Sequence, residues 1–449
     1  MKHWTLMPGA EVIEVNRSAA VEMAQLGIPP CIKVWLQKRM TPPRVLVLPD
    51  TFFRRGVVQV CLEFFLYHFL FVQGKAYGRL PEDARLTLVG TEDQLRRARR
   101  VLEVTLFGFK PEEMRAWTDL AAYGGLGRRL PDQTLHMLRH LRTWFTPKKC
   151  GFSELRDLVR QAVQERGVPT FGSTQAVRAL SKTCPPLVAD FVDRYRNEPL
   201  DEIKILAWEH SSISLDDAIE WRAYDSQGRA RLLGDDVFIE HGGNNEFRLV
   251  APDSAVTVNL NFEADQAPYL IMLPPAAEPV VPDVFQVLCL GSDSGFEVEH
   301  PTTGFAICLN GQWAVVDAPV CASYMLGQYG IHPTDVRVVL ETHGHEDHMG
   351  SGIHFLLECL TAGHCYSYVA AEPVYRTCLV KVAAILGVTE EEAEILLNQG
   401  FRAKTPGRAR ALRIRPGEPV RMLGATWHFV WMVHPVPTTG FRIELAQGK

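Results

Sequence analysis

Hydrophobic and polar positions follow two periods along this chain, and their order predicts strand-then-helix units near the N-terminus. The run RVLVLPD at 44–50 predicts a strand, and the apolar stretch Val57–Val72 after it predicts a buried helix. Residues 85–108 repeat this order, with a strand ending at Gly90, an N-cap at Thr91 and an amphipathic helix. Two such units indicate an α/β layer.

The middle of the chain changes its pattern twice. Apolar residues recurring at three and four predict helices at 132–145 and 152–166. Short alternating runs at 246–251 and 255–264 predict antiparallel β structure. The proline-bearing segment 276–283 predicts a linker. The expected organisation is therefore an α/β and helical domain at 1–195, a β-rich segment at 196–275 and a further domain at 283–449.

After the linker, short strands and turns precede one unusual loop. Asn310-Gly311 is a favoured hairpin turn pair, and Asp317 ends the second strand of that predicted hairpin. The segment 335–343 predicts a buried strand and 350–360 a helix, and the loop between them reads ETHGHEDHMG. Loops at such strand-to-helix junctions are where α/β proteins commonly place their chemistry.

Composition narrows the function classes. With 449 residues, 47% of them hydrophobic, the chain is long enough for two or three domains. A net charge of −5 argues against nucleic-acid binding through bulk charge. The ten cysteines are scattered without a CxxC pair, so neither a disulfide framework nor a cysteine zinc site is indicated. With no secretory h-region at the N-terminus, and with Val57–Val72 too short and too polar to cross a bilayer, we expect a cytoplasmic protein without a membrane partner.

The loop gathers three histidines and one aspartate within six residues, His343 to His348. In a turning loop His343 and His345 point the same way, while Asp347 and His348 can reach a second position. Imidazole and carboxylate suit zinc, which we favour, and also iron or manganese. Two such ions roughly 3.5–4 Å apart can share a hydroxide. A loop that merely caps a helix would need one polar residue and not four.

This loop, THGHEDHMG, resembles the HxHxDH signature of the metallo-β-lactamase fold superfamily. Upstream, the predicted hairpin ending at Asp317 resembles the opening hairpins of that fold, and downstream WMVHPVPTTGFRIEL resembles its third metal motif. The HPVPTTGF form, with His434 six residues before Gly440, is closer to the tRNase Z and phosphodiesterase branch than to lactamases. The resemblance implies an α/β chain that ends in a partial metallo-β-lactamase αββα sandwich at 283–449.

The resemblance also implies a ligand set and two divalent metal ions. One ion is expected at His343, His345 and His434, and the other at Asp347 and His348. The family has a further bridging aspartate and a last histidine after the strand that follows the third motif, and the sequence stops at ELAQGK before them. We therefore expect a C-terminally incomplete sandwich with a poorly formed second metal position.

A basic segment lies between the metal motifs. Two predicted helices at 372–387 and 389–400 are expected to form the wall of a cleft, and 401–421 is expected to be a basic hairpin. Arg408, Arg410 and Arg413 in this segment are candidate substrate ligands for a phosphate backbone. A solvated charged strand explains them equally well.

Three functions from different classes fit this sequence. The first is a metal-dependent hydrolase that acts on a phosphodiester or nucleotide through a metal-bound hydroxide, with Asp347 as the catalytic residue that handles the water's proton. The second is a di-iron protein of the same fold that binds or activates oxygen, although His345 stands where flavo-diiron members usually carry glutamate. The third is a non-catalytic sensor. We favour the hydrolase and leave a homo-oligomer open.

Overall fold

The computed structural model describes most of residues 1–113 and 214–445. The longer stretches outside the described residues are 28–33, 114–213, 262–277, 294–300, 400–407 and 433–437. The helices predicted at 132–145 and 152–166 lie outside the described residues and stay predictions.

The N-terminal region is built on a sheet whose six described strands have the order β1-β2-β3-β4-β7-β8. Their bounds are Lys2–Met7, Ala10–Arg17, Ala20–Gly27, Val45–Val47, Leu86–Gly90 and Ile219–Ala223. The first three strands form an antiparallel meander, and β3, β4, β7 and β8 run parallel. Although β8 follows the predicted boundary at residue 195, it pairs with β7 in this N-terminal sheet.

The two predicted strand-then-helix units are present, with one correction. α3 (Glu92–Leu102) begins at Thr91, whose hydroxyl accepts from the backbone of Gln94 while the Gln94 side chain accepts from the backbone of Thr91. The stretch 57–72, predicted as one helix, instead contains the short strand β6 (Val57–Val58), α2 (Leu62–Tyr67) and a π-helical turn, His68–Val72. The two valines pair with β5 (Phe53–Arg54), because β-branched residues favour strand backbone.

A second, antiparallel sheet covers one face of the first. It consists of β9 (Arg229–Arg231), β10 (Phe238–Gly243), β11 (Glu246–Ala251) and β12 (Ser254–Asn259), as the alternating pattern predicted. Its buried residues pack against those of the first sheet in one apolar cluster, which includes Ile239, Phe247, Leu249, Ile13, Leu26, Val47 and Val89.

The C-terminal region starts with a mixed sheet that positions the predicted metal loop. Its described strands are β13 (Phe285–Gly291), β14 (Gly304–Leu309), β15 (Gln312–Val316), β16 (Val336–Leu340), β17 (Cys365–Ala371) and β18 (Arg408–Ile414), in that order. The first three are antiparallel, and β15 to β18 are parallel. The predicted turn is confirmed, since Asn310 and Gly311 both have positive φ, 51° and 76°.

Helices and a further sheet complete this region. The helices are α12 (Ala322–Gln328), α13 (Glu346–Ala362), α14 (Glu372–Leu386) and α15 (Glu390–Gln399), and the further sheet contains β19 (Pro419–Met422), β20 (Ala425–Met432) and β21 (Thr438–Glu444). The prediction of a basic hairpin at 401–421 is wrong, because β18 pairs with β17 and β19 pairs with β20 in a different sheet. A turn at Gly417, with a φ of 99°, lies between them.

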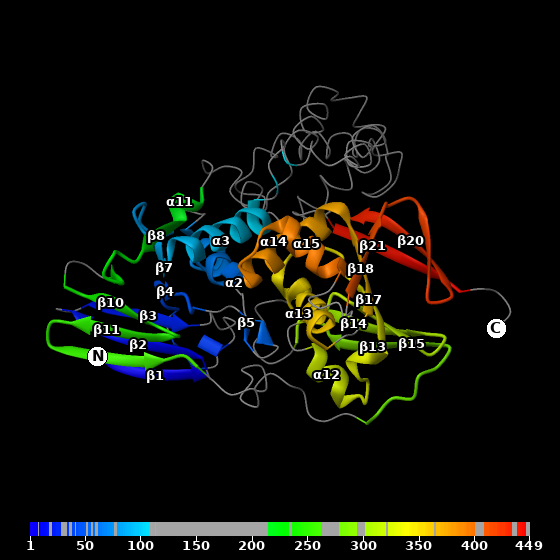
Figure 1. Cartoon of the computed structure of the whole chain (residues 1–449), viewed down its shortest axis with the longest axis horizontal. Coiled ribbons are helices and arrows are strands. Elements are labelled where there is room, and N and C mark those ends of the chain that lie inside the picture. Colours follow the sequence, from blue (N-terminus) through cyan, green and yellow to red (C-terminus); the bar gives the residue numbers. More distant parts are fainter. Residues whose placement is uncertain are drawn as a thin grey trace, which may run out of the picture.

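The two regions share one hydrophobic core, and α3 lies beside α14 in Figure 1. Val101 and Val104 of the N-terminal region pack with Val380 and Ala384 of α14. Arg100 Nε also lies 3.0 Å from Glu390 Oε1 at the start of α15. The metal loop is therefore held in a core to which both regions contribute. Among the described residues, no helix has both the length and the apolar character that a membrane crossing requires.

Candidate metal centre

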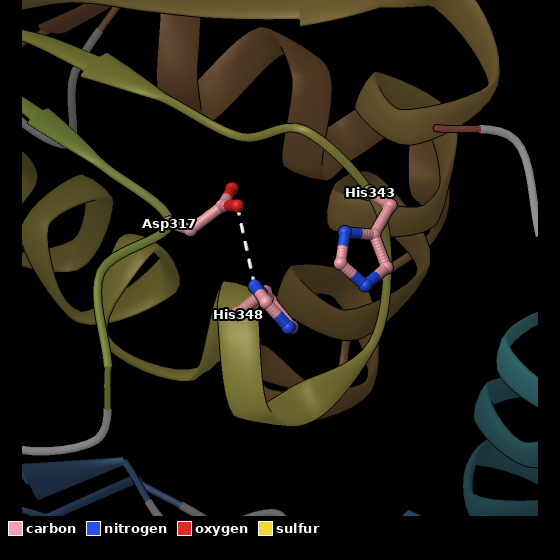
Figure 2. A group of neighbouring side chains, drawn as sticks. All are labelled: Asp317, His343 and His348. Atoms are coloured by element: carbon pink, nitrogen blue, oxygen red, sulfur yellow. Dashed lines mark hydrogen bonds and ion pairs between the residues drawn. The ribbon is translucent and has the colours of Figure 1, made fainter. Parts of the chain in front are cut away.

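The loop predicted to bind metal joins β16 to α13 at one edge of the mixed sheet (Figure 2). Strands β15 and β16 are parallel, with Val316 opposite Leu340, so Asp317 leaves one strand beside the loop that leaves the other. The backbone N–H of Asp317 donates to the carbonyl of Leu340 over 2.9 Å. This is the carboxyl edge of parallel strands, where α/β proteins bind ligands.

Asp317 is the hydrogen-bonding centre of this edge. Its Oδ1 accepts from the backbone N–H of Thr342 at 2.7 Å, and its Oδ2 accepts from the Thr342 hydroxyl at 2.6 Å. Its Oδ2 also lies 3.2 Å from His348 Nδ1. The residue has a φ of 46°, a left-handed conformation that aspartate adopts more readily than most residues. The carboxylate thus connects both ends of the histidine loop.

These contacts determine which ring nitrogens carry protons. Because an ionised carboxylate only accepts hydrogen bonds, His348 Nδ1 donates to Asp317. The Thr342 hydroxyl gives its one proton to the same carboxylate and can only accept from His343 Nδ1, which lies 2.9 Å away. In the neutral form both imidazoles therefore present the electron pair of Nε2. This is the tautomer that metal ligands use when their other nitrogen is held by a carboxylate or a similar acceptor.

The potential ligand atoms converge. Asp317, His343 and His348 each offer one ligand atom, and these atoms lie within 4.8 Å of one another. The ring centroids of His343 and His348 are 4.1 Å apart, and those of His343 and His345 are 4.9 Å apart. Asp347 Oδ2 lies 3.7 Å from His348 Nε2, so a carboxylate and an imidazole face the same small volume. This donor set fits divalent transition metals.

His345 and Gly344 fix the shape of the loop. The carbonyl of His345 accepts from the backbone N–H groups of His348 and Met349, at 3.1 and 2.8 Å, and so starts α13. At Gly344 an added Cβ would lie 2.7 Å from Thr377 Cγ2 on α14, so the loop approaches that helix more closely than a side chain permits. Both His343 and His345 are buried, at 4% and 8% exposure.

The third motif reaches the same loop. His434 lies outside the described residues, and its role as a ligand stays a prediction. On either side of it, Met432 and Thr438 pair in the β20–β21 hairpin. The next residue, Thr439, donates its backbone N–H to the carbonyl of Thr342 over 2.9 Å and is 1% exposed. The described part of the motif is thereby attached to the residue that precedes His343.

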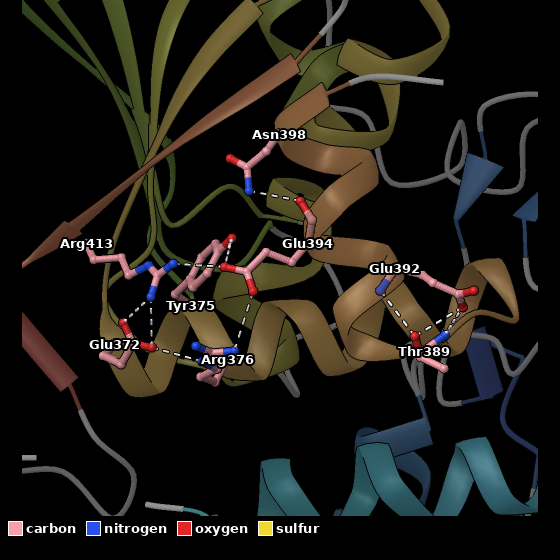
Figure 3. A network of polar contacts seen from close by, with 8 residues as sticks. All are labelled: Glu372, Tyr375, Arg376, Thr389, Glu392, Glu394, Asn398 and Arg413. Atoms are coloured by element: carbon pink, nitrogen blue, oxygen red, sulfur yellow. Dashed lines mark hydrogen bonds and ion pairs between the residues drawn. The ribbon is translucent and has the colours of Figure 1, made fainter. Parts of the chain in front are cut away.

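The three candidate substrate arginines lie on β18, and their positions differ. By strand alternation Arg408 and Arg410 are on one face and Arg413 on the other. Figure 3 shows Arg413 between α14 and α15, where its guanidinium lies 3.3 Å from Glu372 and 2.8 Å from Glu394. Arg410 is exposed, and the side chain of Arg408 is not among the described parts of the structure. Arg413 thus has a structural partner on each of two helices.

Several buried groups beneath the loop were not anticipated from the sequence. Lys381 of α14 is 2% exposed and donates to Glu346 and to the carbonyl of Gly344, and Glu63 of α2 is 5% exposed beside it. Burial alone would lower the pKa of Lys381, but Glu346 and Glu63 raise it above its ordinary value, so the ammonium stays charged. The sequence does contain one signal for this buried cluster, since Lys381 interrupts the otherwise apolar run CLVKVAAIL.

Two pKa shifts lie at this site. Burial and the nearby charge of Asp317 raise the pKa of Glu341 well above its usual range, and an added Cβ on Gly352 would overlap the Glu341 carboxyl. For His348, burial lowers the pKa, but the hydrogen bond to Asp317 and the charge of Asp347 outweigh it and raise the value. Without metal, burial therefore favours the neutral form of Glu341, while Asp317 and Asp347 favour the protonated form of His348.

A comparison with known families identifies this architecture. The sequence model of the metallo-β-lactamase superfamily matches residues 298–440, which include β14 to β20 and the whole metal loop. This segment belongs to the metallo-β-lactamase superfamily. The expected metallo-β-lactamase fold of the C-terminal region is thereby confirmed. Its placement in the tRNase Z branch stays a prediction.

Two curated relatives of the metallo-β-lactamase segment come from Dictyostelium discoideum. The cGMP-dependent 3′,5′-cGMP phosphodiesterase A is 28% identical over 165 residues, which are 36% of this chain and 17% of that protein. The cAMP/cGMP-dependent 3′,5′-cAMP/cGMP phosphodiesterase B is 27% identical over 168 residues, 37% of this chain and 14% of that protein. The match thus spans less than a fifth of the length of either relative. Among solved structures, the metallo-β-lactamase fold protein YhfI from Bacillus subtilis aligns with a TM-score of 0.28 and 17% identity, over 35% of this chain and 57% of that one.

Proposed function

We propose that this chain is a metal-dependent phosphodiesterase whose centre is the loop between β16 and α13. The observation that carries the proposal is the approach of Asp347 Oδ2 to His348 Nε2, 3.7 Å, with His348 oriented by Asp317 from behind. An oriented imidazole with a carboxylate beside it is a typical donor pair for a divalent ion, whereas helix capping needs only one polar side chain. The family of the segment and the two phosphodiesterase relatives support the substrate class.

Two groups of residues would each bind one metal ion. His343, His345 and His434 would hold one ion, and Asp347 with His348 the other. When bound, such a pair of ions would polarise a phosphoryl oxygen and make a nearby water acidic at neutral pH. We favour zinc, with iron or manganese as the alternatives.

Side chains of the protein would orient the ligands, transfer the proton and attract the substrate. Asp317 would keep His343 and His348 in the Nε2-presenting tautomer throughout turnover, because its two oxygens hold Thr342 and His348. Asp347, 21% exposed at its side chain, would accept the proton of the attacking water and release it to the leaving oxygen. Arg410, exposed on β18, would attract the phosphate of the substrate.

The decisive experiment measures metal content and diester cleavage together. The full chain should contain zinc or iron and should hydrolyse bis-p-nitrophenyl phosphate or a 3′,5′-cyclic nucleotide. Asp347→Ala should lower kcat by about 10² or more, since it removes both a ligand and a proton acceptor. His343→Ala with His345→Ala should abolish metal binding.

His428→Ala is the matched control for these histidine variants. His428 Nε2 lies 3.0 Å from Glu444 Oε2 on β21, away from the loop, and its loss should leave metal content and kcat unchanged. A wild-type chain that binds metal, cleaves no diester and consumes oxygen would overturn the proposal in favour of a di-iron oxygen enzyme. A chain that binds neither metal nor diester would favour a sensor.

A further inference from the structure

A cluster of three buried charges lies directly beneath the metal loop and is not part of the ligand set. Lys381 of α14, Glu346 of α13 and Glu63 of α2 are 2%, 6% and 5% exposed. Glu63 belongs to the N-terminal region, 283 residues before Glu346. This cluster is therefore a polar contact between the N-terminal region and the metal loop.

The contacts of the cluster go to backbone atoms of the loop. Lys381 Nζ donates to the carbonyl of Gly344 at 3.0 Å and to Glu346 Oε2 at 2.7 Å. Glu63 Oε2 accepts the backbone N–H of Glu346 at 3.2 Å and lies 3.8 Å from Lys381 Nζ. Gly344 separates His343 from His345, and Glu346 immediately precedes Asp347. The cluster thus binds the backbone of Gly344 and Glu346, the two residues that alternate along the loop with the predicted ligands His343, His345 and Asp347.

Stability alone does not explain this arrangement. Burying three charges is costly, and buried ion pairs can often be replaced by apolar side chains of similar volume without loss of stability. The hydrogen bonds of the cluster are directed to the carbonyl of Gly344 and the N–H of Glu346, the backbone groups that flank His345 and Asp347. Fixing ligand side chains within roughly half an ångström does require such support.

We propose that Glu63, acting together with Lys381, is a positioning residue for the metal centre. Through Glu346 N and Gly344 O it sets the backbone from which His345 and Asp347 project. The N-terminal region thereby becomes a part of the catalytic unit, and not only a neighbour of it. This inference rests on the proposed metal centre.

Cobalt(II) binding to the full chain tests the inference without relying on turnover. The dissociation constant is measured by competition with a chelator, and the visible absorption of bound cobalt reports its coordination. Glu63→Ala should weaken cobalt binding by about 10- to 100-fold, as is usual when support for a metal ligand is removed. Glu63→Gln keeps an acceptor for Glu346 N and should recover part of that affinity.

Glu390→Ala is the matched control, because the contact of Glu390 with Arg100 also joins the two regions but does not touch the loop. It should change cobalt affinity less than twofold and leave the cobalt spectrum unchanged. Lys381→Met should weaken binding as Glu63→Ala does, and it decides the matter if Glu63→Ala does not fold.

The outcomes separate this inference from the proposed function. If the wild-type chain binds no cobalt, the metal centre itself is wrong and the positioning role fails with it. If wild type and Glu63→Ala bind cobalt equally, with the same spectrum, only the positioning role is wrong. Equal losses in Glu63→Ala and Glu390→Ala would also overturn it, since a general loosening of the two regions would then explain both.

Discussion

At the scale of single residues, Asp317 determines more of the site than any predicted ligand. Its two oxygens hold Thr342 and His348, and through Thr342 they also set the proton of His343. One carboxylate therefore aligns two imidazoles that are five residues apart in sequence. The site depends on its charge and on its acceptor-only character.

Asp317→Asn tests this role of Asp317. The amide of the variant can turn an N–H toward His348 Nδ1. His348 Nδ1 would then accept that hydrogen bond, and the ring proton would be on Nε2, the nitrogen that a metal ion needs. We expect zinc affinity to fall by about 10- to 100-fold, measured by chelator competition. Asp335→Asn is the control, because Asp335 accepts from His332 N at the far end of β16. Wild-type affinity in Asp317→Asn would contradict the tautomer argument.

Glu341 makes stability depend on pH. Its pKa is raised in the folded chain, so the neutral acid favours folding at pH values below the ordinary pKa near 4.5, and that contribution is lost as pH rises toward the folded value. Each unit of the raised pKa costs about 1.4 kcal/mol at high pH. In metal-free protein, the unfolding free energy of Glu341→Gln should therefore exceed that of wild type by a margin that grows as the pH rises from about 5 to about 8.

Urea unfolding at several pH values measures this difference. A gap between Glu341→Gln and wild type that does not change with pH would show that the Glu341 carboxyl ionises normally.

At the scale of elements, strand β18 presents its arginines to two different surroundings. Arg413 points to α14 and α15, where Glu372, Glu394 and the ring of Tyr375 surround its guanidinium (Figure 3). Arg410 lies on the opposite face and is exposed. The basic segment is therefore not a single patch.

Paired variants on β18 distinguish these roles. Arg410→Ala should raise KM for a diester several-fold with kcat unchanged, because a peripheral phosphate contact contributes uniform binding. Arg413→Ala should leave KM unchanged and lower the unfolding free energy by at most about 1 kcal/mol, since its pairs are partly solvated. A higher KM in Arg413→Ala alone would reverse the assignment.

The sequence predicted elements well where local signals were strong. Thr91 caps α3 as expected, and the Asn310-Gly311 hairpin and the histidine loop form where the pattern placed them. The basic hairpin failed because the partner of a strand is a long-range choice, which charge composition does not encode. Glu63 could not be predicted for the same reason: its partners are set only when two regions pack together.

At the scale of the whole molecule, the proposed metal centre would link metal binding to folding. The predicted ligands come from a loop whose supports lie on α2 and α14, directly after β15, and on β21, so a metal ion should bind the folded chain much better than the unfolded one. Zinc at 100 times its dissociation constant should raise the unfolding free energy by about 2.7 kcal/mol, which calorimetry would detect as a higher Tm. His343→Ala with His345→Ala should lose this response, whereas His428→Ala should retain it.

The 283-residue separation between Glu63 and Glu346 has a consequence for biosynthesis. A ribosome adding about 5–20 residues per second needs roughly 15–60 s between these two residues. During that time α2 and the apolar side of α3 have no helix α14 to cover them, and the carboxylate of Glu63 lacks its lysine. The N-terminal region thus leaves the ribosome with part of its apolar surface uncovered, and we expect a fragment that ends before α14 to aggregate more readily than the full chain.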